Sequence, residues 1–210
     1  EEIRPAEELW AQAEKTREGR RILGIPWVDH AKAIETYQAI IDNYPYSDYE
    51  IRIIGALIRL GRRQEAMELT RFMLADRRIL VWNQWPEISW RDPLGPSFIG
   101  DLPHTWISGE YILAVCTLFA YEREADESLV IAAGLAEEWL KDGFPVGVRG
   151  LPTYFGKLSY SLRLEGEDTL RLTLEGNLKM PRGGSVVQPP LPRPIRQVEV
   201  NGKALKEFST

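Results

Sequence analysis

The stretch KLSYSLRLEGEDTLRLTLEG, Lys157 to Gly176, decides the fold class of this 210-residue chain. Apolar and polar residues alternate along it with a period of two, which is typical of strands with one buried face. Gly-Glu-Asp interrupts the alternation and predicts a turn between two antiparallel strands. The apolar faces consist of Leu158, Tyr160, Leu162 and Leu164 in the first strand and Leu170, Leu172 and Leu174 in the second.

The same alternation extends to both sides of this hairpin. It recurs in LVIAAGL (129–135) and in IRQVEVNGKAL (195–205), where Asn-Gly predicts a hairpin turn. We therefore expect an antiparallel sheet or β-sandwich over residues 125–210. The proline-rich segment VVQPPLPRPIR (186–196) could bind a domain that recognises polyproline helices, but the pattern favours a loop or edge strand.

The first 124 residues have helical rather than strand periodicity. Two helices joined at Gly61 form a predicted αα-hairpin, whose inward residues include Ile51, Leu57 and the segment 72–74. We predict about five helices in all, and the fold class is therefore α+β with a helical domain at 1–124 and a β domain at 125–210. The predicted helices are AEELWAQAEKTREGRR from Pro5 onward, 28–44, the two of the hairpin, and 107–122.

Composition excludes several classes of protein. The net charge of −5 and a pI near 5.3 give no general attraction to nucleic acid or anionic membranes. The longest apolar run, YILAVCTLFAY (111–121), is shorter than the roughly 20 residues of a membrane span. Its Cys116, the chain's single cysteine, fits a small buried hydrophobe better than a reactive thiol. Because the chain begins with Glu1 rather than Met, we expect a fragment or processed form, whose compartment is not indicated.

Known cofactor motifs are absent from the sequence. It has no nucleotide-binding glycine loop, no G-x-S-x-G elbow and no zinc-ligand spacing, and one histidine without a nearby second argues against a metal site. We therefore expect no cofactor and no metal.

The stretch WNQWPEISWRDPLGPSFIGDLPHTWISGEY, 82–111, concentrates aromatic and ionisable residues in a long loop. Glycan cleavage uses both kinds, because sugar rings stack on aromatic planes and the glycosidic oxygen needs a proton. A loop of this length is typical of an active-site rim. The possible acids or bases are Glu87, Asp92, Asp101 and Glu110, and the possible sugar contacts are Trp82, Trp85, Trp90, Trp106 and His104.

Each of these residues also has a structural interpretation. The tryptophans could pack in the core, and Asp92 before Pro93 could serve a turn. Asp101 could orient the loop or cap the following helix, and Glu110 could be favoured there by the helix dipole. His104 could carry a proton, but a structural or substrate hydrogen-bonding role fits better.

The order of these segments resembles the C-terminal part of bacterial six-hairpin glycoside hydrolases. The resemblance covers Asp48 to Lys206 and rests on the hairpins, WNQWPEISWRDP, GDLPHTWISGEYI, PTYFGKLSYSLRLEGEDTLRLTLEG and VEVNGKAL in that order. It implies part of an (α/α)6 toroid followed by a small β-sandwich. The arrangement is closest to discoidin-domain-associated members and more distantly similar to inverting α-L-rhamnosidases.

The resemblance also implies roles for individual residues. Glu87 matches the general base, with Asp92 and Asp101 as substitutes, since here the acid follows Trp-Pro rather than Trp directly. His104 matches the histidine that lines the sugar pocket. A full toroid has about twelve helices and the general acid belongs to an earlier hairpin, so the partner acid is expected from an N-terminal remainder or a complementary chain.

Three functions therefore remain open. The first is a glycoside hydrolase portion acting on poly- or oligosaccharides, with a carbohydrate substrate. The second is a non-catalytic carbohydrate-binding or structural module. The third is a helical-repeat interaction protein, for which the long loop would be dispensable.

Overall fold

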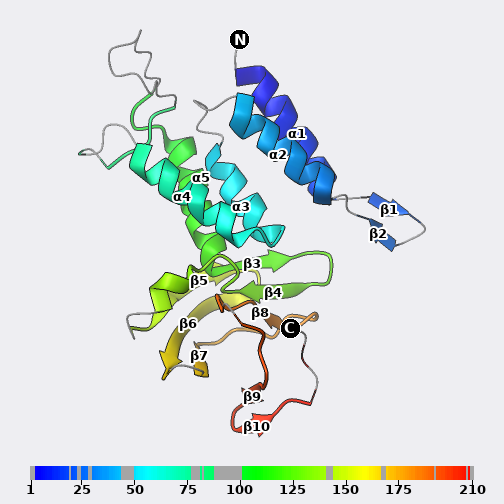
Figure 1. The fold of residues 1–210 in the computed structure, drawn as a ribbon, viewed down its shortest axis with the longest axis vertical. Helices are drawn as coiled ribbons and strands as arrows, with labels where there is room; N and C mark the ends of the chain where they lie inside the picture. The colour runs from blue at the N-terminus through cyan, green and yellow to red at the C-terminus, as the bar shows by residue number, and fades with distance from the viewer. Residues whose placement is uncertain are drawn as a thin grey trace.

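The protein has an α+β fold in which the long helices occupy one end of the molecule and the strands of residues 120–204 the other (Figure 1). None of the helices in the described residues is long and apolar enough to cross a membrane. The computed structural model describes residues 3–18, 20–22, 25–27, 30–43, 50–76, 81, 83–87, 101–140, 144–166, 169–191, 193–206 and 208.

The first two helices lie side by side, at the helical end of the molecule (Figure 1). Helix α1 (Ile3–Glu18) begins two residues before the predicted start at Pro5, and α2 spans His30–Asn43. The rings of Trp10 and Tyr37 meet between them with centroids 5.5 Å apart. A short antiparallel hairpin that the sequence analysis did not predict connects them, formed by β1 (Arg20–Ile22) and β2 (Ile25–Trp27).

Helices α3 (Glu50–Arg59) and α4 (Arg63–Asp76) form the predicted αα-hairpin. Gly61 lies between them with φ +75°, a conformation that glycine adopts without steric cost. The predicted inward face of α3 is buried, but the prediction for α4 was wrong at Phe72 and Leu74, which are exposed. Of residues 72–74, only Met73 is buried, because only one side of α4 faces the core.

Helix α5 (Thr105–Phe119) runs directly into strand β3 (Ala120–Arg123). The predicted helix to residue 122 was therefore wrong at its C-terminal end. Ala120 is extended, with φ −161°, and residues from it onward pair with β4 (Ser128–Ile131). The backbone groups of this buried segment form hydrogen bonds with β4, which replace the bonds that a longer helix would have made.

The second half of the chain forms two three-stranded sheets. In one, β5, β6 and β7 form an antiparallel meander, and the predicted hairpin at 157–176 is confirmed as β6–β7. In the other, β4 pairs with β3 antiparallel and with β8 parallel, so this sheet is mixed rather than purely antiparallel. The strands are β5 (Val146–Thr153), β6 (Gly156–Glu165), β7 (Thr169–Glu175) and β8 (Ser185–Val187).

One hydrophobic core is shared by the two sheets. Leu129 and Ile131 of β4 pack with Leu158 and Leu162 of β6, and all four are fully or almost fully buried. The hydroxyl of Tyr160 also donates to the carbonyl of Phe119 at 2.9 Å, and burial raises the pKa of this phenol. Strand β6 is thereby attached to the end of α5.

The C-terminal segments follow the sequence prediction. The Pro-rich stretch begins with the edge strand β8 and continues without regular structure in its described part. Strands β9 (Glu199–Val200) and β10 (Lys203–Ala204) form the predicted hairpin. Asn201 and Gly202 both have positive φ, as a two-residue hairpin turn requires.

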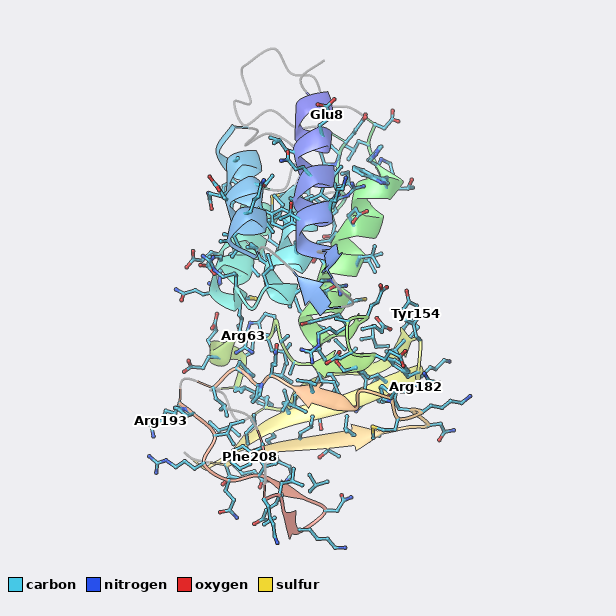
Figure 2. All side chains as sticks on the ribbon, turned by 90° about the vertical axis from the view of Figure 1, so that its right-hand side faces the viewer. Glu8, Arg63, Tyr154, Arg182, Arg193 and Phe208 are labelled. Carbon is cyan, nitrogen blue, oxygen red and sulfur yellow. The ribbon has the colours of Figure 1, made fainter. Side chains whose placement is uncertain are left out.

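Arg63 joins the helices to the β half of the molecule. It lies at the junction between them (Figure 2). Its guanidinium donates to the carbonyls of Ala133 at 2.6 Å, Gln188 at 2.6 Å and Pro189 at 3.1 Å. One side chain from the start of α4 therefore fixes both the segment after β4 and the segment after β8.

Candidate functional site

Two short segments of the long loop lie side by side just before α5. The amide of Glu87 donates to the carbonyl of Asp101 at 3.0 Å, and the amide of His104 donates to the carbonyl of Trp85 at 2.8 Å. Residues 85–87 are thereby held against residues 101–104, although 13 residues separate them in the chain. The peptide bond between Leu102 and Pro103 is cis.

This pairing brings Glu87, Asp101 and His104 together. One oxygen of each carboxylate and one ring nitrogen of the histidine all lie within 4.8 Å of one another. Glu87 and His104 are half-buried, whereas Asp101 is exposed. Three of the predicted site residues therefore converge on one place at the surface of the helical half.

Asp101 contacts Glu87 through its main chain and is not the residue that precedes α5. The residue that precedes α5 is His104, and its side chain makes no capping hydrogen bond. Asp101 instead pairs through its main chain with Glu87, and its amide also approaches Glu87 Oε2 at 3.4 Å, a long contact. These contacts use the main chain of Asp101, so the roles considered for its side chain stay predictions.

The described tryptophans of the loop have different environments. Trp106 is 37% exposed and meets the ring of His104 edge to face, with centroids 5.9 Å apart. Trp85 is 5% exposed and packs in the helical core against Tyr111, so its ring is covered by protein. Trp106 is therefore the exposed aromatic surface beside the cluster, and Trp85 attaches the loop to the helical core.

Three other predicted site residues lie outside the described residues. They are Trp82, Trp90 and Asp92.

Arg52 is a neighbour of the site that the sequence analysis did not identify. Its guanidinium lies over the ring of Trp106, 4.0 Å from the centroid, and 5.7 Å from that of Trp10. Its Nε is 3.3 Å from Glu110 Oε1, in a half-buried ion pair. This stacking fixes the Trp106 plane. Glu110 therefore pairs with Arg52. Because α5 begins at Thr105, Glu110 lies beyond the first turn of the helix, where the helix dipole was expected to favour it.

The predicted pattern and the observed cluster differ in one respect. The sequence showed a histidine, His104, without a second one nearby, and it predicted no metal, but the fold adds two carboxylates from separate parts of the loop. A nitrogen and two oxygens in this arrangement can bind a cation, share protons or contact a polar ligand. A signal for this in the sequence was the pair of acids at 87 and 101 that precede His104 in the same loop, but only the pairing of the two segments brings the three residues together.

A separate hollow of about 280 Å³ lies between α2, α3 and α4. Ile34, Leu57, Leu69 and the exposed Phe72 contribute to its wall, together with the ion pair of Arg62 and Glu65. Its lining does not include Glu87, Asp101 or His104.

Comparison with known proteins identifies no relative: no family model, no curated protein and no solved structure matches this chain.

Proposed function

We propose that this chain supplies one wall of the sugar-binding cleft of a glycoside hydrolase, and that Glu87 is the general base of that site. The observation that supports this most strongly is the convergence of Glu87, Asp101 and His104 beside the exposed plane of Trp106. A carboxylate next to an aromatic platform meets both needs of glycan cleavage, which are proton transfer and contact with the apolar face of a sugar ring.

The architecture is compatible with the corresponding proposal for the fold. The helical hairpins would be consecutive members of an (α/α)6 toroid, and the two sheets with their shared core would form a β-sandwich. In such a toroid the described helices contribute less than half of the barrel, and the other helices come from sequence outside this chain.

The spacing of the carboxylates assigns them different roles. A retaining pair has its carboxyl groups about 5 to 5.5 Å apart and an inverting pair about 6.5 to 9.5 Å apart. Glu87 and Asp101 have oxygens within 4.8 Å of each other, which is shorter than the separation in either kind of pair. We therefore propose that Asp101 orients Glu87, and that the general acid is another carboxyl group, contributed by the rest of the enzyme.

Glu87→Gln tests the catalytic role directly, since it keeps the size of the side chain and removes the base. We expect the full-length protein to hydrolyse a member of a glycan panel, and the variant to lose about 10² to 10⁴-fold in kcat with an unchanged circular dichroism spectrum. The control is Glu175→Gln, an exposed glutamate at the end of β7, which should keep full activity. Unchanged turnover in Glu87→Gln would remove Glu87 from the mechanism.

A second candidate function is carbohydrate binding without cleavage. The observation in its favour is that Arg52 lies over the ring of the exposed Trp106, 4.0 Å from its centroid, so that this ring can contact a sugar without any catalytic group. In this case Trp106→Ala weakens glycan binding, and no glycan of the panel is cleaved by the full-length protein.

A further inference from the structure

We propose that Glu87, Asp101 and His104 together bind one divalent transition-metal ion, with Zn²⁺ as the reference ligand. The proposal goes beyond the glycan chemistry above, because metal binding at these three side chains requires no sugar and no second carboxyl group from elsewhere. It starts from the one group of three or more potential metal ligands found among the described residues.

The first argument is geometric. Nitrogen and oxygen ligands lie about 2.0 to 2.2 Å from a zinc ion, so two ligands of one ion are at most about 4.4 Å apart. The three candidate atoms lie within 4.8 Å of one another, so small side-chain rotations bring them to a common ion. The main-chain hydrogen bonds between residues 85–87 and 101–104 already fix the backbone positions from which these side chains extend.

The second argument is the donor set. One imidazole nitrogen with two carboxylate oxygens suits Zn²⁺, Mn²⁺ or Co²⁺, whereas Ca²⁺ and Mg²⁺ prefer sites built of oxygen alone. Three protein ligands also leave a coordination position for water. The partial exposure of the cluster gives an ion access to it from solvent.

The third argument is charge. Two carboxylates held this close repel each other, and a divalent cation between them reverses that repulsion. The Nε of the neighbouring cation Arg52 lies 3.3 Å from Glu110 Oε1, and its guanidinium lies over the ring of Trp106. A metal ion between Glu87 and Asp101 would neutralise this pair of negative charges.

The metal site and the proposed general base are compatible. A carboxylate has two oxygens, so Glu87 can bind an ion through one of them while the other accepts a proton from water.

The test is calorimetric titration of the full chain, stripped of metal, with Zn²⁺ and separately with Ca²⁺. We expect one Zn²⁺ per chain and no comparable binding of Ca²⁺. His104→Gln and Glu87→Gln should each weaken Zn²⁺ binding at least about tenfold. His30→Gln, which removes the other histidine, and Glu175→Gln should bind as the parent protein does.

A second test of the ligands uses Co²⁺ in place of Zn²⁺, because the visible absorption of Co²⁺ depends on its ligands and their geometry. We expect His104→Gln to change the spectrum of the Co²⁺ protein and His30→Gln to leave it unchanged. Circular dichroism confirms that each variant is folded; if His104→Gln is not, Asp101→Asn at the exposed ligand provides the same comparison.

Three results would overturn the proposal. They are the absence of saturable Zn²⁺ binding, equal affinity in the triple variant Glu87→Gln, Asp101→Asn, His104→Gln, and preferential binding of Ca²⁺. The result is independent of the glycosidase assay, since Zn²⁺ binding without hydrolysis contradicts only the proposed function, and hydrolysis without Zn²⁺ binding contradicts only the metal site.

Discussion

Asp126 illustrates how a single residue stabilises the turn between β3 and β4. Its carboxylate accepts from Arg123 Nε at 3.0 Å, Arg123 Nη2 at 2.6 Å and Ser128 Oγ at 2.7 Å. The hydrogen bonds from Arg123, followed by that from Ser128, lower the pKa of Asp126 to about 2. Each of these contacts favours the ionised form, so folding and ionisation of Asp126 are linked.

This linkage predicts a pH-dependent effect of Asp126→Asn. Because the folded pKa is depressed, the stabilisation is complete above the ordinary value of about 4 and is lost as the pH falls through about 2. We expect the parent protein to have a higher Tm than the variant between pH 5 and 7, and the difference to shrink below about pH 4. The difference should be small and salt-sensitive, since the carboxylate is exposed.

Thermal unfolding of both proteins from pH 7 to pH 3 provides the measurement. A Tm difference that stays constant over this range would show that the ionised carboxylate contributes no stability.

At the scale of the elements, Gly147 sets how closely β5 and β6 approach. A Cβ at this position would lie 1.9 Å from the carbonyl oxygen of Tyr160, far inside van der Waals contact. Gly147→Ala should therefore separate the two strands and reduce the free energy of unfolding by about 1 to 3 kcal/mol.

Chemical denaturation of Gly147→Ala checks this, with Gly109→Ala in α5 as the matched control. A Cβ at Gly109 meets nothing within 4 Å, and alanine favours a helix over glycine, so this variant should equal or exceed the parent protein in stability. Equal stability of both variants would contradict the close approach of β5 and β6.

The elements that sequence could predict are those specified by local pattern. The β6–β7 hairpin is confirmed because its alternation and its turn lie within 20 residues. The end of α5 was predicted three residues too far, because the apolar run 111–121 fits a buried helix and a buried strand equally well. The parallel pairing of β8 with β4 was not predicted, since it joins three-residue segments more than 50 residues apart.

At the scale of the whole molecule, Arg63 connects the helices to the sheets (Figure 2). Arg63→Met keeps an unbranched side chain as far as the position of Nε but leaves the carbonyls of Ala133, Gln188 and Pro189 without this donor. We expect it to reduce the free energy of unfolding by about 2 to 4 kcal/mol. Arg63→Lys should retain only part of the stability that Arg63→Met loses, because an ammonium group lacks the planar fork of donors.

Urea unfolding of the two variants measures this effect, and Arg62→Met is the control. Arg62 is adjacent in sequence and contacts Glu65 within its own helical hairpin, so its loss should change stability little. A similar loss of unfolding free energy in Arg62→Met and Arg63→Met would contradict a stabilising role of the hydrogen bonds between Arg63 and the β half.

The candidate site was predictable in its components but not in its assembly. Sequence identified Glu87, Asp101 and His104 individually, because loops rich in tryptophan and acids are typical of binding sites. It left open whether Trp85 packs in the core or contacts a sugar, and it did not predict that Arg52 lies over Trp106, since both depend on packing between segments distant in the chain. The expectation of no metal was made without this cluster in view, because its three side chains come from two separate segments of the loop.

The central claim is that glycans bind at the surface formed by Trp106 and the Glu87, Asp101 and His104 cluster. The most direct test is a glycan titration followed through the indole N–H resonances of Trp106 and Trp139, assigned by single Trp→Phe variants. The two side chains are matched, being 37% and 36% exposed, but Trp139 lies on the short helix η2 (Glu137–Leu140) beside β6. We predict a saturable shift of Trp106 with Trp139 unchanged; a shift of both to the same extent, or of neither with any glycan, would contradict the claim.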